Sequence, residues 1–313
     1  MLGTVLAAQG DRCIVAIDRS VSQELRSGDL SKVSRAAAND ATALQFPPIT
    51  AGEVVIPMSV LDLFRLDGKK AVVTGASSGI GKRVALAYAQ AGAEVAVAAR
   101  HSEALDEVTR EIAAAGAGEV LPISCDVTRP EHVARMVEQV TGELGGIDIA
   151  VCNAGIVTLN GLLDMPLEEV QSIQNTNVNG VFLTAQAAAR AMVRQERGGV
   201  IINTASMSGH IINIPQQEGH YCTSKAAVIQ LTKAMAVEFA AHKIRVNSVS
   251  PGYILTELVE PYTEYHALWE PKIPLGRLGR PDELMGLYVY LASEASSYMT
   301  GSDIVIDGGY TCI

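Results

Sequence analysis

The chain has 313 residues, 48% of them hydrophobic and 19% charged, and a formal net charge of −10 at pH 7. The acidic balance argues against general nucleic-acid binding, and no apolar run approaches the ~20 residues that a membrane-spanning helix needs. The five cysteines are scattered and odd in number, as expected of free thiols in the cytoplasm. Neither they nor the six histidines show metal-ligand spacing, so we expect no metal site.

Residues 1–57 do not share the pattern of the rest of the chain. They contain five Lys or Arg against six Asp or Glu, without sustained apolar periodicity. A transit peptide is poor in acidic residues and a signal peptide has an apolar core after basic residues, so neither is indicated. We expect residues 1–57 to be an N-terminal extension, either disordered or upstream of the true start, and residues 58–313 to form a single α/β domain.

The first predicted strand is the apolar run KKAVV at 69–73, which is followed by three glycines and an Ala-rich helical stretch at 83–93. A strand, a glycine turn and a helix N-terminus bring free backbone N–H groups to one point, where a phosphate binds without a side-chain cation. Such a cluster alone can be only a tight turn, but the flanking strands favour a dinucleotide site. Its predicted contacts are Gly75, Ser77, Ser78, Gly79, Ile80 and Gly81.

The next predicted strand, EVAVAA at 94–99, ends where a dinucleotide fold usually carries an acid for the adenosine ribose. That position is Ala99, and Arg100 and His101 follow it. A guanidinium can pair with a 2′-phosphate in two hydrogen bonds, so this pattern favours NADP(H) over NAD(H). The alternative is that Arg100 is simply a solvated loop residue.

An acidic residue follows the strand LPISC. Asp126, with Val127 beside it, is a candidate for hydrogen bonding to the adenine amino group. A plain helix N-cap role for Asp126 or Thr128 is the competing interpretation.

Further along the chain, Tyr221 and Lys225 are four residues apart on a predicted helix that runs to about Glu238, so they share one face. A free phenol has a pKa of about 10, which makes it a poor proton shuttle at neutral pH. One ammonium at ~4 Å contributes on the order of 4 kcal/mol at an effective dielectric of ~20, so Lys225 alone is roughly enough to bring the phenol into use. The spacing by itself is common on protein surfaces.

Seven motifs follow one another along the chain: TGASSGIG at 74–81, CNAG at 152–155, NVNG at 177–180, IINTASMSG at 201–209, YCTSK at 221–225, SPGYILT at 250–256 and IVIDGG at 304–309. From about residue 61 to the end, the chain therefore resembles the short-chain dehydrogenase/reductase family, and Met58 resembles an ordinary start for it. The resemblance implies a Rossmann-type, doubly wound parallel sheet with helices on both faces, and a homotetramer.

The resemblance also implies roles for single residues. Asn153 would stabilise the central strand beside the cofactor, although Cys152 stands where the family more often has a second Asn. Asn177 would hold a helix distortion and the water of a proton relay, while Tyr221 would exchange the proton and Lys225 would also bind the nicotinamide ribose. The other cofactor contacts implied are Ala154, Gly155, Pro251, Gly252, Ile254 and Thr256.

Two residues compete for the role of catalytic serine. The family's usual spacing to the tyrosine points to Ser208, whereas its usual place at a strand end points to Ser206. A loop absorbs two extra residues cheaply, but a strand shifted by two changes every contact along it. We therefore prefer Ser206 as the group that hydrogen-bonds the substrate carbonyl, with Ser208 lining the pocket.

The stretch SMSGHIINIPQ at 206–216 resembles the branch of the family that interconverts sugar alcohols and ketoses, such as mannitol 2-dehydrogenase, sorbose reductase and xylulose reductase. We therefore expect hydride transfer between NADP(H) and a ketone or secondary alcohol, with a ketose or polyol as the small-molecule substrate. His210, Asn213 and Gln216 could hydrogen-bond its hydroxyls, or they could satisfy loop backbone.

Two other functions are open. A 3-oxoacyl-carrier-protein reductase needs a basic docking surface, but residues 257–273 hold four glutamates against one lysine. A regulator that binds NADP(H) without turnover could dispense with the catalytic set, which is complete here.

The C-terminal region supplies the expected tetramer interface, formed by the strand SDIVIDGG and the helix DELMGLYVYLA at 282–292. The apolar face of that helix could equally be core.

Overall fold

The computed structural model describes residues 5–9, 12–16, 59–115, 117 and 120–313. Two units are distinguished, with the division after Met58. In the first, strands β1 (Val5–Gln9) and β2 (Arg12–Ala16) pair antiparallel. Sequence periodicity did not indicate these strands. Apart from them, the segment predicted to be an N-terminal extension lies outside the described residues.

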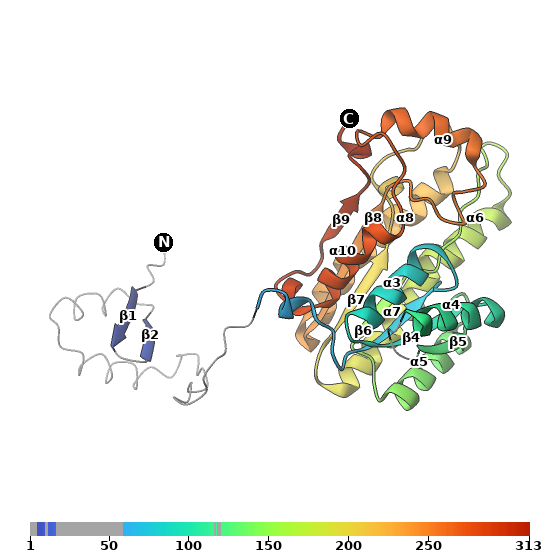
Figure 1. Ribbon diagram of the computed structural model, residues 1–313. Coiled ribbons are helices and arrows are strands. Elements are labelled where there is room, and N and C mark those ends of the chain that lie inside the picture. The colour runs from blue at the N-terminus through green and yellow to red at the C-terminus, as the bar shows by residue number, and fades with distance from the viewer. Residues whose placement is uncertain (1–4, 10–11, 17–58, 116, 118–119) are drawn as a thin grey trace. The chain divides into compact units, whose positions relative to one another are not determined.

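The second unit is built on one sheet of seven parallel strands in the order β5-β4-β3-β6-β7-β8-β9 (Figure 1). Each strand pairs with its neighbours in parallel register, which confirms the predicted doubly wound α/β fold. The strands are β3 (Lys70–Thr74), β4 (Glu94–Ala99), β5 (Val120–Ser124), β6 (Ile149–Cys152), β7 (Gly199–Thr204), β8 (Ile244–Pro251) and β9 (Asp303–Ile306).

Helices cover both faces of the sheet (Figure 1). Because successive strand residues point to opposite faces, Val72 belongs to one hydrophobic core and its neighbours Ala71 and Val73 to the other. The first core includes residues of α5 (Pro130–Leu144), α7 (Gly180–Gln195) and α8 (Gly219–Phe239). The second includes residues of α3 (Gly79–Gln90), α4 (Ser102–Ala114) and α10 (Asp282–Ala292). Two short helices, α6 (Leu167–Gln174) and α9 (Thr263–Trp269), lie near the carboxyl ends of the strands (Figure 1).

The strand order reverses between β3 and β6, because the chain first adds β4 and β5 on one side of β3 and then continues on the other. In open α/β sheets, ligands bind outside the carboxyl ends of the strands at such a switch point. Here the two strand ends are joined by the Thr74 hydroxyl, which donates to the carbonyl of Val151 at 3.1 Å and accepts from the backbone N–H of Asn153 at 3.1 Å.

In the described part of the chain, Cys125, Cys152, Cys222 and Cys312 are free thiols, and there is no group of three or more His, Cys, Asp or Glu that could hold a metal ion. None of the helices described is both long and apolar enough to cross a membrane.

Candidate active site

The glycine turn after β3 is sterically closed to larger residues. Gly75 has a φ of +63°, and a Cβ there would lie 2.7 Å from the Cα of Ala154. A Cβ on Gly81 would lie 2.3 Å from the carbonyl oxygen of Gly75. Asn153 braces the turn from β6, since its side-chain amide donates to the carbonyls of Thr74 and Gly75 at 3.1 Å each.

Helix α3 begins at Gly79, four residues before the predicted start, so its N-terminus lies in the glycine turn. Ser78 occupies the N-cap position without a side-chain hydrogen bond, and the first turn contains no acidic residue. The backbone N–H groups of this turn are therefore left for a ligand, and the helix dipole favours an anion there. The predicted contacts Ser77, Ser78 and Ile80 lie in this turn, which fits a pyrophosphate.

The turn after β8 lies against the same glycines. Gly79 has a φ of +52°, and a Cβ on it would meet Thr256 at 3.2 Å. Ile254 forms an isolated bridge with Gly279, which holds the chain beyond Pro251 and Gly252 beside the sheet. Thr256, predicted from a motif some 180 residues after the glycine turn, thus reaches that turn.

Arg100 and His101 are exposed directly after β4. Asp126 follows β5, and its carboxylate accepts hydrogen bonds from the backbone N–H and hydroxyl of Thr128 at 3.0 and 2.8 Å. Burial acts to raise the pKa of Asp126, but these hydrogen bonds and the charge of Arg100 lower it on balance. Asp126 therefore supports its own turn, as in the competing interpretation, while facing Arg100. The side chain of Val127 packs in the core, which leaves only its backbone for a ligand.

Asn177 is fully buried in a π-helical turn, η3 (Asn175–Asn179), between α6 and α7. Its amide donates to the carbonyl of Ile156 at 2.9 Å and to the Ser224 hydroxyl at 3.1 Å, and its carbonyl accepts from the N–H of Ile156 at 2.9 Å. A Cβ on Gly155 would lie 3.4 Å from the Asn177 carbonyl oxygen and 3.6 Å from the Lys225 ammonium. The CNAG turn, η3 and α8 therefore meet at one place.

Lys225 is buried on α8 and donates from Nζ to the carbonyl of Thr204 at 2.8 Å, with Nζ 5.6 Å from the centre of the Tyr221 ring. Burial lowers the pKa of Lys225 to about 8. Tyr221 is half-buried, and its pKa is raised by the removal of its hydroxyl from water and by the charge of Glu218, against the effect of a hydrogen bond with Ser206. The largest influence on the Tyr221 pKa in this structure is burial, which acts against the lowering that was predicted from Lys225.

The two candidate serines belong to one hydrogen-bonded chain. Ser206 follows β7 and caps the short 3-10 helix η4 (Met207–Gly209) by accepting from the N–H of Ser208 at 3.1 Å. Its hydroxyl donates to the Ser208 hydroxyl at 3.1 Å, which in turn donates to the Glu218 carboxylate at 3.4 Å. Of the two serines, only Ser206 lowers the pKa of Tyr221, so Ser206 lies nearer to the phenol than Ser208 does.

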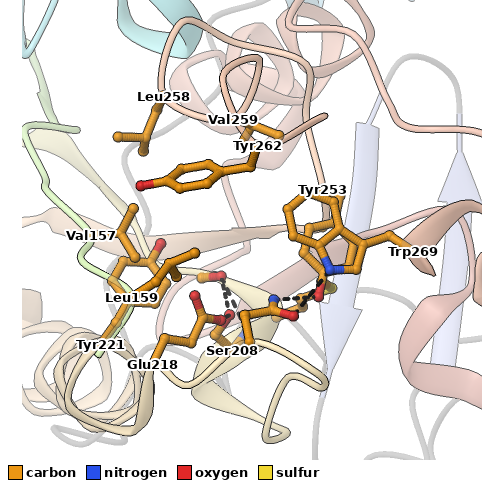
Figure 2. Close-up of a pocket in the computed structure, with 14 residues that line it drawn as sticks. Val157, Leu159, Ser208, Glu218, Tyr221, Tyr253, Leu258, Val259, Tyr262 and Trp269 are labelled. Carbon is orange, nitrogen blue, oxygen red and sulfur yellow. Dashed lines mark hydrogen bonds between the residues drawn. The ribbon is translucent and has the colours of Figure 1, made fainter. Parts of the chain in front are cut away.

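A cavity of about 80 Å³, with room for several water molecules, opens in front of Tyr221. Leu258 and Tyr262 face Tyr221 and Glu218 across it, and Trp269 closes one side (Figure 2). The full lining is Val157, Leu159, Ser206, Met207, Ser208, Gln216, Glu218, Tyr221, Gly252, Tyr253, Leu258, Val259, Tyr262 and Trp269.

Of the side chains predicted to contact substrate, Ser208 and Gln216 line the cavity, but His210 and Asn213 do not. The His210 ring pairs with the carboxylate of Asp303 at 2.7 Å, because the loop carries it to β9. The Asn213 amide is buried and donates to the Tyr253 hydroxyl at 2.9 Å. The Asn213 side chain therefore supports Tyr253 in the cavity wall, while His210 is held at β9.

Sequence reasoning missed Glu218 and the aromatic wall of the cavity. Tyr253 stacks on Trp269 with ring centres 4.0 Å apart, and Tyr265 stacks on the other side of Trp269 at 5.5 Å. The only available signal for Glu218 was its place one helical turn before Tyr221, on the same face of the chain.

Glu218 makes stability depend on pH in a direction that can be measured. Burial raises its pKa from the ordinary 4.5 to about 7, against hydrogen bonds from Ser208 and Gln216. The folded protein thus holds this proton more tightly than the unfolded chain, so stability falls as pH rises through this window. Above pH ~7, where Glu218 is ionised, the free energy of unfolding is lower by about 3 kcal/mol, at ~1.4 kcal/mol per pH unit.

Glu218→Gln removes that penalty, so its melting temperature relative to wild type should be higher at pH 8 than at pH 5 by several degrees. Thermal unfolding of both proteins at the two pH values checks this. Glu264→Gln is the control, because the carboxyl group of Glu264 on α9 is exposed. It should shift the melting temperature equally at the two pH values. An equal shift for Glu218→Gln as well would contradict the expected protonation of Glu218.

A parallel sheet with a glycine turn at its switch point, and a serine, tyrosine, lysine and asparagine gathered beside it, defines the class of short-chain dehydrogenases and reductases. The chain belongs to that family. Residues 75–311 match the family described as enoyl-(acyl carrier protein) reductase.

Relatives of known name agree with this assignment. The chain is 42% identical to a sorbose reductase of Candida albicans over 268 residues, which cover 85% of this chain and 95% of that protein. It is 40% identical to a probable NADP-dependent mannitol dehydrogenase of Yarrowia lipolytica over 281 residues, 88% and 99% of the two chains. The crystal structure of a short-chain type dehydrogenase/reductase from Mycobacterium marinum is 77% identical, with a TM-score of 0.81, and covers 82% of this chain and all of that one.

Proposed function

We propose that this protein is an NADP(H)-dependent oxidoreductase that transfers a hydride between the nicotinamide and a ketone or secondary alcohol, with ketoses and polyols as substrates. The observation that carries the proposal is the cavity that presents Ser206 and Tyr221 together, backed by the buried ammonium of Lys225.

When bound at the glycine turn, NADPH would supply the hydride that reduces the substrate carbonyl. Ser206 positions the carbonyl oxygen, and the Tyr221 hydroxyl gives its proton to the developing alkoxide. Lys225 is largely protonated at neutral pH, since its pKa of about 8 lies above it, and its charge stabilises the phenolate that remains. The amide oxygen and nitrogen of Asn177 both hydrogen-bond the backbone of Ile156, which fixes the η3 turn. We propose that this turn positions the water of the relay that returns a proton to Tyr221.

The choice of NADP(H) rests on the end of β4, where Ala99 leaves no carboxylate for the ribose and Arg100 is exposed. The mannitol dehydrogenase relative named NADP-dependent supports it. Arg100→Ala should therefore weaken the binding of NADPH by roughly 10- to 150-fold, because a charge-assisted hydrogen-bonded pair is lost. The binding of NADH should be almost unchanged.

The dissociation constants of both cofactors, measured by calorimetry, check this expectation. Arg110→Ala, in an exposed arginine of α4, is the matched control and should alter neither constant. Equal losses for NADPH and NADH in Arg100→Ala would contradict the assignment, because only NADPH carries the extra phosphate.

The substrate class is supported by the names of the sorbose reductase and mannitol dehydrogenase relatives. A cofactor-coupled absorbance screen of ketoses, diketones and 3-oxoacyl thioesters, with NADPH and NADH in parallel, tests it. Reduction of 3-oxoacyl thioesters alone would favour a carrier-protein reductase, which the glutamates of residues 257–273 disfavour. NADP(H) binding without any turnover would favour a regulator.

We also propose a cytoplasmic homotetramer that acts in polyol metabolism. β9 is an edge strand of the sheet, and Val305 on it is exposed, which suits pairing with another copy. In α10, by contrast, Leu284, Tyr288 and Leu291 are buried in the core, so less of its apolar face is left for an interface. The mass in solution, from light scattering, tests the tetramer.

A further inference from the structure

Glu218 is a buried carboxyl group that lines the catalytic cavity without a part in hydride transfer. It is 7% exposed and precedes the first residue of α8, one turn before Tyr221. Its side chain lies beside Ser208 and Tyr221 on one side of the cavity (Figure 2). Such groups are rarely buried without a partner, so its surroundings indicate what it binds.

The protein supplies Glu218 with few hydrogen-bond donors. A carboxylate has about four acceptor sites, whereas Ser208 donates only at 3.4 Å and Gln216 shares its amide with the Tyr253 hydroxyl at 2.7 Å. The raised pKa of Glu218 reflects the same shortage, because burial outweighs these hydrogen bonds. A hydrogen-bond donor on the substrate would give the Glu218 carboxylate the partner that the protein does not supply.

No cation balances this carboxyl. None of the residues lining the cavity is a lysine or arginine, and the nearby Lys225 directs Nζ to the backbone of Thr204. The titratable groups that face Glu218 are Tyr221 and Cys222 of α8 and, across the cavity, Tyr262 (Figure 2). A second carboxylate, carried by a substrate, would therefore meet an unscreened like charge.

Several other polar atoms around the cavity are already paired. Trp269 donates its ring N–H to the Gln216 carbonyl at 3.0 Å, and the Tyr253 hydroxyl accepts from Asn213 and Gln216. Glu218 is linked to Ser206 through Ser208 alone. It thus stands one hydrogen-bonded residue away from the group that positions the reacting carbonyl.

We propose that Glu218 accepts a hydrogen bond from a substrate hydroxyl on the carbon next to the reacting carbonyl, and so selects neutral hydroxylated ketones over plain ketones and over sugar acids. The inference rests on the proposed function of this cavity and adds to it a residue that determines substrate specificity.

The test compares acetoin with butanone, which have the same carbon skeleton and differ by that one hydroxyl. Wild type, Glu218→Gln, Glu218→Leu and the surface control Glu264→Gln are assayed with NADPH at pH 8, where Glu218, with its pKa of about 7, is ionised. The measured quantity is the ratio of kcat/KM for acetoin to that for butanone, and comparing it between variants cancels the intrinsic reactivity of the two ketones. A second ratio compares a ketogluconate with D-fructose.

We expect the acetoin-to-butanone ratio to fall roughly 10- to 100-fold in Glu218→Leu and by less in Glu218→Gln, whose amide still accepts a hydrogen bond. The ketogluconate-to-fructose ratio should rise in both variants, because the like charge is gone. Glu264→Gln should keep both wild-type ratios. If Glu218 only supports Ser208, the variants lose activity on acetoin and butanone equally, and this result would overturn the proposal.

The failure of the proposed function is distinguishable. A wild-type protein that reduces none of these compounds refutes the proposed function. Calorimetric binding of D-mannitol to wild type and to Glu218→Leu, in the presence of NADP⁺, then decides the role of Glu218 alone. Weaker binding by the variant supports it, and equal binding refutes it.

Discussion

Tyr221→Phe is expected to lower turnover by roughly 10²- to 10⁴-fold, the usual worth of a positioned general acid. The substitution removes only the hydroxyl that interacts with Ser206 and faces the cavity. Phenylalanine preserves the ring beneath the Lys225 ammonium, 5.6 Å away, so the fold and the lysine should be undisturbed. The loss should therefore appear in kcat, with NADPH binding retained.

Single-turnover kinetics with NADPH and a ketose, together with cofactor titration, check this prediction. Tyr265→Phe is the matched control, because Tyr265 stacks on Trp269 outside the cavity lining and has no expected role in proton transfer. Its turnover should stay within a few-fold of wild type. If Tyr221→Phe kept even a tenth of wild-type turnover, Tyr221 would not be the proton donor.

Gly81→Ala is expected to weaken NADPH binding by roughly 100-fold or more. The new Cβ would lie 2.3 Å from the Gly75 carbonyl oxygen and 2.5 Å from the Asn153 amide, both of which are fixed by their neighbours. The turn must move to relieve that overlap. The movement costs ~1–3 kcal/mol of strain, and the loss of the two hydrogen bonds from Asn153 costs ~1 kcal/mol each. At about 1.4 kcal/mol per factor of ten, these losses reach the stated weakening.

The comparison series is built from other glycines of the chain. Gly142→Ala in α5 meets no atom within 4 Å, so it should leave NADPH binding unchanged and raise stability by up to ~1 kcal/mol. Gly79→Ala should be intermediate, since alanine at a φ of +52° costs ~1–2 kcal/mol and its Cβ would meet Thr256 at 3.2 Å. Dissociation constants and melting temperatures of the series are measured together. A folded Gly81→Ala protein with wild-type NADPH affinity would refute the phosphate role of this turn.

The short-range features of the site could be predicted from the sequence because the residues that make them are close together in the chain. The strand, glycine turn and helix around Gly79 occupy one segment, and only the start of α3 was misplaced, by four residues. Glycine permits the turn, but it does not show where helical hydrogen bonding begins. Tyr221 and Lys225 share a face for the equally local reason that they are one turn apart on α8.

The amino-acid sequence by itself determined the family, the parallel sheet and the glycine turn, and it predicted the set of Ser206, Tyr221 and Lys225. Only the tertiary structure decided which polar groups meet a substrate, because pairing and burial depend on segments far apart in the chain. His210 pairs with Asp303, 93 residues later, and Asn213 donates a hydrogen bond to Tyr253, 40 residues later. Neither side chain is therefore available to a substrate. The proposed role of Glu218 depends on the aromatic wall of its cavity and on the lack of a lysine or arginine in the cavity lining, neither of which its neighbours in sequence reveal.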